Sequence, residues 1–176
     1  MNIVGAGVNN GIALSEDGQY AWVAETFRRR IVGVSLEATD MAEPEPCLTD
    51  LPGYPDNLDR DDTGLLWGAL FAPPNRALET LRARPGIAKA VARLTGGRQL
   101  IKAPRHPRAF AYDPEQHALE AITFEAPRPY APLTTVRRVG QHLYLASIEQ
   151  STLAIAALPA ELSAFADTAS DVGQSG

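Results

Sequence analysis

Short apolar runs separated by tight polar turns recur along the chain, and this pattern constrains the fold more than any other feature. Residues 12–14 and 20–24 are two such runs, joined by Ser-Glu-Asp-Gly, which has the composition of a hairpin turn. Residues 31–36 alternate like a third strand, and strand-turn-strand blocks follow at 55–70, 108–124 and 136–158. Blocks spaced by roughly 40 residues are typical of β-propeller blades, although a β-sandwich would need the same strands.

One segment breaks this pattern. Residues 75–94 predict a short helical insert, because Asn75 can cap a first helix and Pro85 suits the first turn of a second. Eight of the 16 Lys and Arg residues lie between Arg82 and Arg108, a stretch without Asp or Glu. This basic stretch could attract an anionic substrate or make a peripheral membrane contact, but a solvated helix face explains it at least as well.

The composition excludes several classes of protein. A net charge of −5 argues against a nucleic-acid binder, which needs a broad positive surface. Cys47 is the only cysteine, so the chain has no internal disulfide and no multi-cysteine zinc cluster. Apolar runs fall short of the roughly 18 residues of a membrane span and the first residues do not resemble a secretory signal, so we expect a cytoplasmic protein.

The strand pattern covers most of the chain. Residues 1–159 carry it and are expected to form one β domain. Residues 160–176 lose the periodicity and become rich in Ser, Asp and Gly. We therefore predict that they form a disordered tail.

Candidate metal ligands stand at the start of two strand blocks. Asn10 precedes the run at 12–14, and Asp56 and Asn57 open the block at 55–70. In a propeller such positions gather at the mouth of the axial channel, and their oxygens suit calcium or magnesium far better than zinc. Asn-Gly and Pro-Asp-Asn are also ordinary turn and loop sequences, so the residues alone leave both interpretations open.

Two longer motifs carry a resemblance to a known family. The stretches NGIALSEDGQYAWVAETFRRRIVGVSL and DLPGYPDNLDRDDTGLLWGALF resemble the strictosidine synthase-like branch of the calcium-dependent gluconolactonase and paraoxonase superfamily. The resemblance continues through the insert and the closing GQHLYLASI, so that it spans about residues 8–158. It implies an all-β fold, a partial β-propeller with about three blades of a six-bladed ring and the helical insert at 75–94.

The resemblance also implies the residues of a site. Asn10 matches the calcium-ligating Asn of the family's Asn-Gly-hydrophobic motif. Asp56 matches a second ligand, which is also the proposed general base, and Asn57 matches a ligand of paraoxonase-like members. The implied cofactor is Ca²⁺ or another divalent cation, and the implied substrate is a small ester or lactone.

The family's remaining ligands, an acidic residue in the first blade and an Asn in a middle blade, have no counterpart in this sequence. We therefore expect the chain to be the C-terminal half of a longer propeller, whose intact form carries the activity. Three blades leave two open faces, so self-association into a complete ring is an alternative.

The expected function is metal-dependent hydrolysis of esters or lactones, of the gluconolactonase or arylesterase type. Thr134 occupies the place of the catalytic Glu of alkaloid-forming strictosidine synthases, and Thr cannot transfer protons as a carboxylate does at neutral pH. The sequence also keeps Asp56, which those enzymes lose, so strictosidine-type condensation is disfavoured. A non-enzymatic propeller that binds a partner is the alternative from another class.

Overall fold

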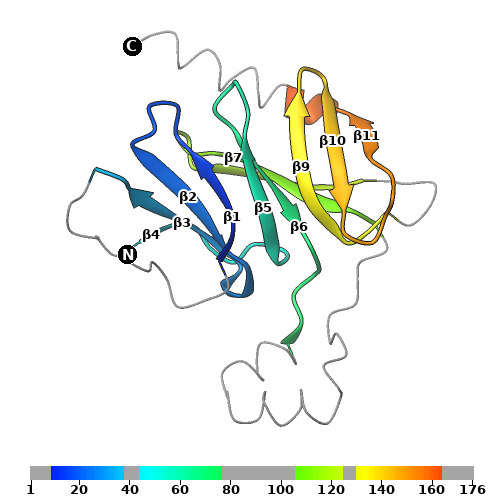
Figure 1. Cartoon of the computed structure of the whole chain (residues 1–176), viewed down its shortest axis with the longest axis horizontal. Helices are drawn as coiled ribbons and strands as arrows, with labels where there is room; N and C mark the ends of the chain where they lie inside the picture. The colour runs from blue at the N-terminus through cyan, green and yellow to red at the C-terminus, as the bar shows by residue number, and fades with distance from the viewer. Residues whose placement is uncertain (1–8, 38–43, 77–105, 125–129, 164–176) are drawn as a thin grey trace.

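Strands dominate the computed structural model, which describes residues 9–37, 44–76, 106–124 and 130–163 (Figure 1). The first sheet contains β1 (Asn9–Leu14), β2 (Tyr20–Glu25), β3 (Arg30–Ser35) and β4 (Glu45–Leu48) in that order, with a 3-10 turn, η1 (Thr26–Arg28), after β2. The second contains β5 (Pro55–Arg60), β6 (Leu66–Leu70), β7 (Arg108–Asp113) and β8 (Ala118–Thr123). The third contains β9 (Leu133–Val139), β10 (His142–Ser147) and β11 (Ala154–Ala157).

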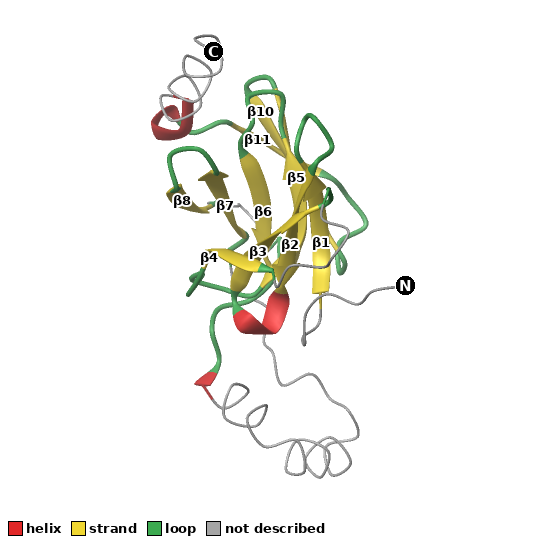
Figure 2. Cartoon of the chain, turned by 90° about the vertical axis from the view of Figure 1, so that its left-hand side faces the viewer, coloured by secondary structure: helices red, strands yellow, loops and turns green. Residues whose placement is uncertain are grey.

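Each sheet is an antiparallel meander, in which consecutive strands pair with one another. β1, β5 and β9 are the first strands of the three sheets, and β5 contacts both of the others (Figure 1). Figure 2 shows β4 and β8 on the side away from β1 and β5. Three meanders with their first strands together confirm the predicted all-β fold and the partial propeller of about three blades.

The second sheet corrects the sequence-based count of blocks. The blocks at 55–70 and 108–124 form one sheet, because β6 pairs directly with β7 in a register that places Trp67 opposite Ala111. Because a long sequence separates β6 from β7, the two blocks had been counted separately, although they belong to one blade. Apart from residues 75 and 76, the predicted helical insert at 75–94 lies outside the described residues.

Apolar side chains fill the two spaces between the sheets. The first core joins the first and second sheets and includes Trp22, Ile31, Leu66, Phe110 and Tyr112. The second core joins the second and third sheets and includes Trp67, Ala109, Leu133, Leu143 and Leu145. Burial of these side chains is the main force that holds the sheets together.

The two end sheets expose apolar side chains on their outer faces. Ile12 on β1 is 60% exposed, and it alternates with Ala13, which points into the first core. Ile155 on β11 is also 60% exposed, between Ala154 and Ala156, which pack against the second core. The central sheet has both of its faces covered, so the described sheets end on an unpaired face at either side.

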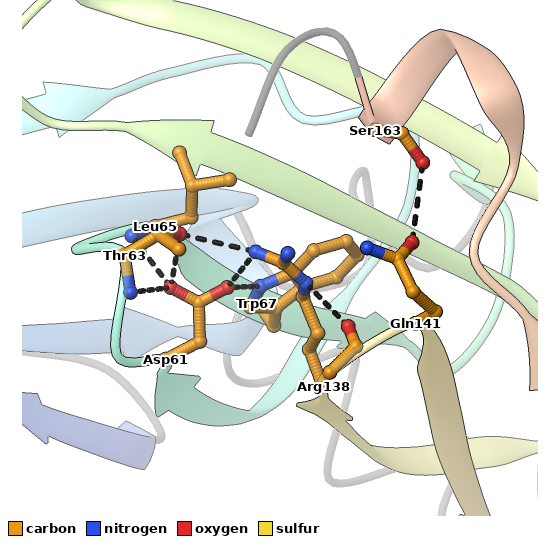
Figure 3. Close-up of polar contacts among 8 residues, drawn as sticks. Asp61, Thr63, Leu65, Trp67, Arg138, Gln141 and Ser163 are labelled. Atoms are coloured by element: carbon orange, nitrogen blue, oxygen red, sulfur yellow. Dashed lines mark hydrogen bonds and ion pairs between the residues drawn. The ribbon is translucent and has the colours of Figure 1, made fainter. Parts of the chain in front are cut away.

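A buried carboxylate links the second and third sheets (Figure 3). Asp61 lies in the turn after β5 and accepts hydrogen bonds from the backbone N–H groups of Thr63 and Leu65 and from the Thr63 hydroxyl. Its other oxygen accepts from the Trp67 indole at 2.8 Å and from the Arg138 guanidinium of β9 at 3.0 Å. The carboxylate is thus fully satisfied and paired, as burial of a charge requires.

The packed part of the chain extends past the predicted boundary at residue 159. Residues 160–163 form a helical turn, and Leu162 is buried in the second core. The predicted tail at 160–176 therefore starts too early, because this turn brings one more apolar side chain onto the sheets. Residues 164–176 lie outside the described part. Among the described residues, no helix is long and apolar enough to cross a membrane.

Candidate functional site

Each of the three inner strands carries a bulge near its first residue. In β1 the pairing with β2 shifts between Asn9 and Ile12, and in β5 the pairing with β6 shifts between Pro55 and Leu58. In β9 the pairing with β10 shifts at Thr134. One extra residue redirects the side chains of a strand, and such bulges are enriched beside functional sites.

These bulges place Asn10, Asp56 and Asn57 at one end of the sheets, which we call the mouth. The mouth is the end at which β1, β5 and β9 begin (Figure 1). β6 ends there too, because Leu70 pairs with Pro55. The long segment that follows β6 therefore leaves the second sheet beside Asp56.

Gly11 allows β1 and β5 to approach closely at the mouth. A Cβ atom at Gly11 would lie 2.2 Å from the backbone nitrogen of Leu58 and 2.6 Å from the Cα atom of Asn57. Backbone atoms cannot move aside as a flexible side chain can, so only glycine fits this position. Glycine is therefore required after Asn10 because β5 packs against it, whereas a solvent-exposed turn would not impose this requirement.

Asn10 and Asp56 contact each other directly. The Asn10 side-chain amide donates a hydrogen bond to the Asp56 carboxylate across 46 residues of sequence. Burial raises the pKa of the Asp56 carboxyl, and the hydrogen bond from Asn10 opposes this rise. The carboxylate is therefore partly shielded from solvent, and this disfavours its charged form.

Asn57 reaches toward the third sheet. Its side-chain amide nitrogen donates to the hydroxyl of Thr135 on β9 at 3.0 Å. The two residues are 78 positions apart, so sequence spacing gave no signal for this contact. The neighbouring Thr134 donates its hydroxyl to the backbone carbonyl of Ala146 at 3.2 Å, and this bond fixes it against β10.

The donor set suits a hard cation. Asn10, Asp56 and Asn57 supply amide and carboxylate oxygens, which calcium and magnesium prefer over the nitrogen and sulfur ligands typical of zinc. Within the described residues, no group of three or more His, Cys, Asp or Glu side chains gathers to hold a metal. The desolvated Asp56 carboxylate is the one negative charge of the three residues, and a bound cation would compensate it.

Comparisons with known proteins agree with this architecture. The chain is 32% identical over 117 residues to Protein STRICTOSIDINE SYNTHASE-LIKE 13 of Arabidopsis thaliana, a match that covers 64% of this chain and 29% of the relative. It is 33% identical over 102 residues to the adipocyte plasma membrane-associated protein of Danio rerio, covering 55% of this chain and 25% of that protein. The chain thus spans between a quarter and a third of the length of these curated relatives. No protein-family model matches it.

A solved structure supports the fold. A gluconolactonase from Xanthomonas campestris superposes with a TM-score of 0.53 and 16% identity, over 90% of this chain and 40% of that structure. At this identity the likeness concerns the fold alone. It agrees with three adjacent sheets as part of a larger propeller.

Proposed function

We propose that this chain, which belongs to the strictosidine synthase-like branch of the gluconolactonase and paraoxonase superfamily of six-bladed β-propellers, forms part of a calcium-dependent hydrolase of esters or lactones. The convergence of Asn10, Asp56 and Asn57 at the bulged starts of adjacent inner strands carries this proposal. The activity is proposed for the intact protein, because the chain spans a minor part of its relatives.

The three residues have different parts in the proposed site. Asn10 and Asn57 contribute neutral amide oxygens, and Asp56 contributes the negative charge that draws a divalent cation to the mouth. A calcium ion bound there would polarise the carbonyl group of an ester or lactone. Asp56 is also the candidate general base, because a carboxylate beside the polarised carbonyl group can accept a proton from the attacking water.

Two features favour hydrolysis over condensation. The hydroxyl of Thr134 is engaged with the Ala146 carbonyl, and a Thr side chain cannot perform the acid-base work of a carboxylate. Asp56 lies beside Asn10 as the proposed ligand set requires. The substrate class is the one that the resemblance to the gluconolactonase and paraoxonase superfamily implies.

The role of Asp56 can be tested with an isosteric variant. Asp56→Asn keeps the shape of the side chain but removes its charge, so we expect calcium affinity to fall at least tenfold, a loss of about 1.4 kcal/mol or more. Isothermal titration calorimetry of the 176-residue chain with CaCl₂ measures the change. Asp62→Asn is the matched control, because Asp62 is an exposed carboxylate in the β5–β6 turn, at the opposite end of β5 from the mouth, and this variant should bind calcium like the unmodified chain.

Hydrolysis is tested separately on the intact protein. Turnover of phenyl acetate or a simple lactone should require calcium, stop on addition of a chelator, and be lost in Asp56→Asn. Calcium binding without hydrolysis across a broad panel of esters and lactones would instead favour a propeller that binds a partner. Equal calcium affinity of Asp56→Asn and the unmodified chain would overturn the proposed site.

A further inference from the structure

Thr135 holds the one amide of the candidate ligand set that reaches across to the third sheet. The Asn57 side-chain nitrogen donates to the Thr135 hydroxyl at 3.0 Å. An amide group carries its nitrogen and its oxygen on two sides of the same carbon atom, and cations bind only the oxygen. Because the nitrogen is held by the Thr135 hydroxyl, rotation of the amide is restricted and its carbonyl oxygen is kept out of that contact.

The register between β5 and β9 fixes this contact. Two residues further along both strands, the Arg137 guanidinium lies 3.6 Å from the Asp59 carboxylate. At the far end of the strands, Arg138 is bound to the buried Asp61 carboxylate. The Asn57–Thr135 hydrogen bond is therefore one of a series of polar contacts by which β9 meets β5 and the turn that follows β5.

Backbone pairing adds to this support. Thr135 is paired with Ala146 of β10, and its neighbour Val136 is buried in the second core. Thr135 thus lies on a strand that pairs with β10 and packs into the second core. Groups that hydrogen-bond metal ligands in this way orient them and raise metal affinity.

We propose that Thr135 is a positioning residue for the cation site, which acts by orienting the side chain of Asn57. This inference rests on the proposed function, because it assigns Thr135 a part in the same site. It concerns metal affinity alone, so its test needs no catalytic activity.

Three variants of the 176-residue chain test the proposal by calorimetric titration with CaCl₂. Thr135→Val is nearly isosteric and removes the hydroxyl, so we expect calcium affinity to fall about 10-fold to 100-fold. Thr135→Ser keeps the hydroxyl and should restore affinity to within about twofold of the unmodified chain, which a purely steric role would not predict. Thr123→Val is the matched control, because Thr123 is exposed on β8, the outermost strand of its sheet.

The outcomes separate this inference from the proposed function. Calcium binding by the unmodified chain with unchanged affinity in Thr135→Val would overturn the role of Thr135 and leave the cation site standing. Equal losses in Thr135→Val and Thr135→Ser would also overturn it, because the hydroxyl would then not matter. Absence of calcium binding by the unmodified chain would overturn a cation site formed by the residues of this chain, and the role of Thr135 with it, whereas the proposed hydrolysis is tested separately on the intact protein.

Discussion

Replacement of Arg138 by methionine is expected to destabilise the chain by about 3–5 kcal/mol, the usual cost of leaving a buried charge without its partner. The Asp61 carboxylate is fully buried, and Arg138 is the cation that pairs with it at 3.0 Å. Methionine preserves much of the side-chain volume, so the loss reports the ion pair rather than a cavity. Urea unfolding followed by tryptophan fluorescence measures it, since Trp67 donates to the same carboxylate.

The adjacent arginine provides a matched control. The Arg137 side chain is 68% exposed and lies 3.6 Å from Asp59. An exposed ion pair contributes at most about 1 kcal/mol, so Arg137→Met should change the free energy of unfolding by no more than that. A loss of about 1 kcal/mol or less in Arg138→Met, no larger than in Arg137→Met, would show that the Asp61 network does not hold the second and third sheets together.

Replacement of Gly11 by alanine is expected to disrupt both the fold and the site at the mouth. The added methyl group would lie 2.2 Å from the backbone nitrogen of Leu58, so β1 and β5 must separate. Overpacking of this kind costs about 1–3 kcal/mol, and contact with rigid backbone places Gly11→Ala at the upper end of that range. The separation also moves Asn10 away from Asp56, so calcium binding should be lost.

Gly18→Ala is the control for this prediction. Gly18 has a φ of +70° and no atom within 4 Å of an added Cβ, so alanine brings only backbone strain of about 1–2 kcal/mol. Its calcium affinity should equal that of the unmodified chain, as measured by calorimetric titration. A Gly11→Ala variant that binds calcium normally would contradict the close approach of β1 and β5.

The local strands of this fold were predictable because their signals are local. The hairpin of β1 and β2 follows from apolar runs on either side of Ser-Glu-Asp-Gly, and the structure pairs Leu14 with Ala21 across that turn. Which strands form the second sheet could not be predicted in this way. Its central pair, β6 and β7, comes together across a long intervening segment, and alternation of apolar residues says nothing about which strands become neighbours.

In the candidate site, too, residues in local motifs could be predicted from the sequence, whereas contacts between distant strands could not. Asn10 and Asp56 could be singled out from their motifs, and the structure places their side chains in contact. Thr135 could not be found, because its contact with Asn57 depends on the register between two strands of different sheets. Leu162 was missed for a related reason, since a single apolar residue in a polar segment becomes visible only when its contacts with the second core are known.

The position of a bound ion would test the proposed cation site most directly. Crystals of the chain grown with terbium, a calcium analogue with a strong anomalous signal, would locate the site without any assumption about activity. An anomalous peak is expected at the mouth, within about 2.3–2.6 Å of oxygen atoms of Asp56 and Asn57. A fully occupied ion elsewhere on the chain, with none beside Asp56, would contradict it.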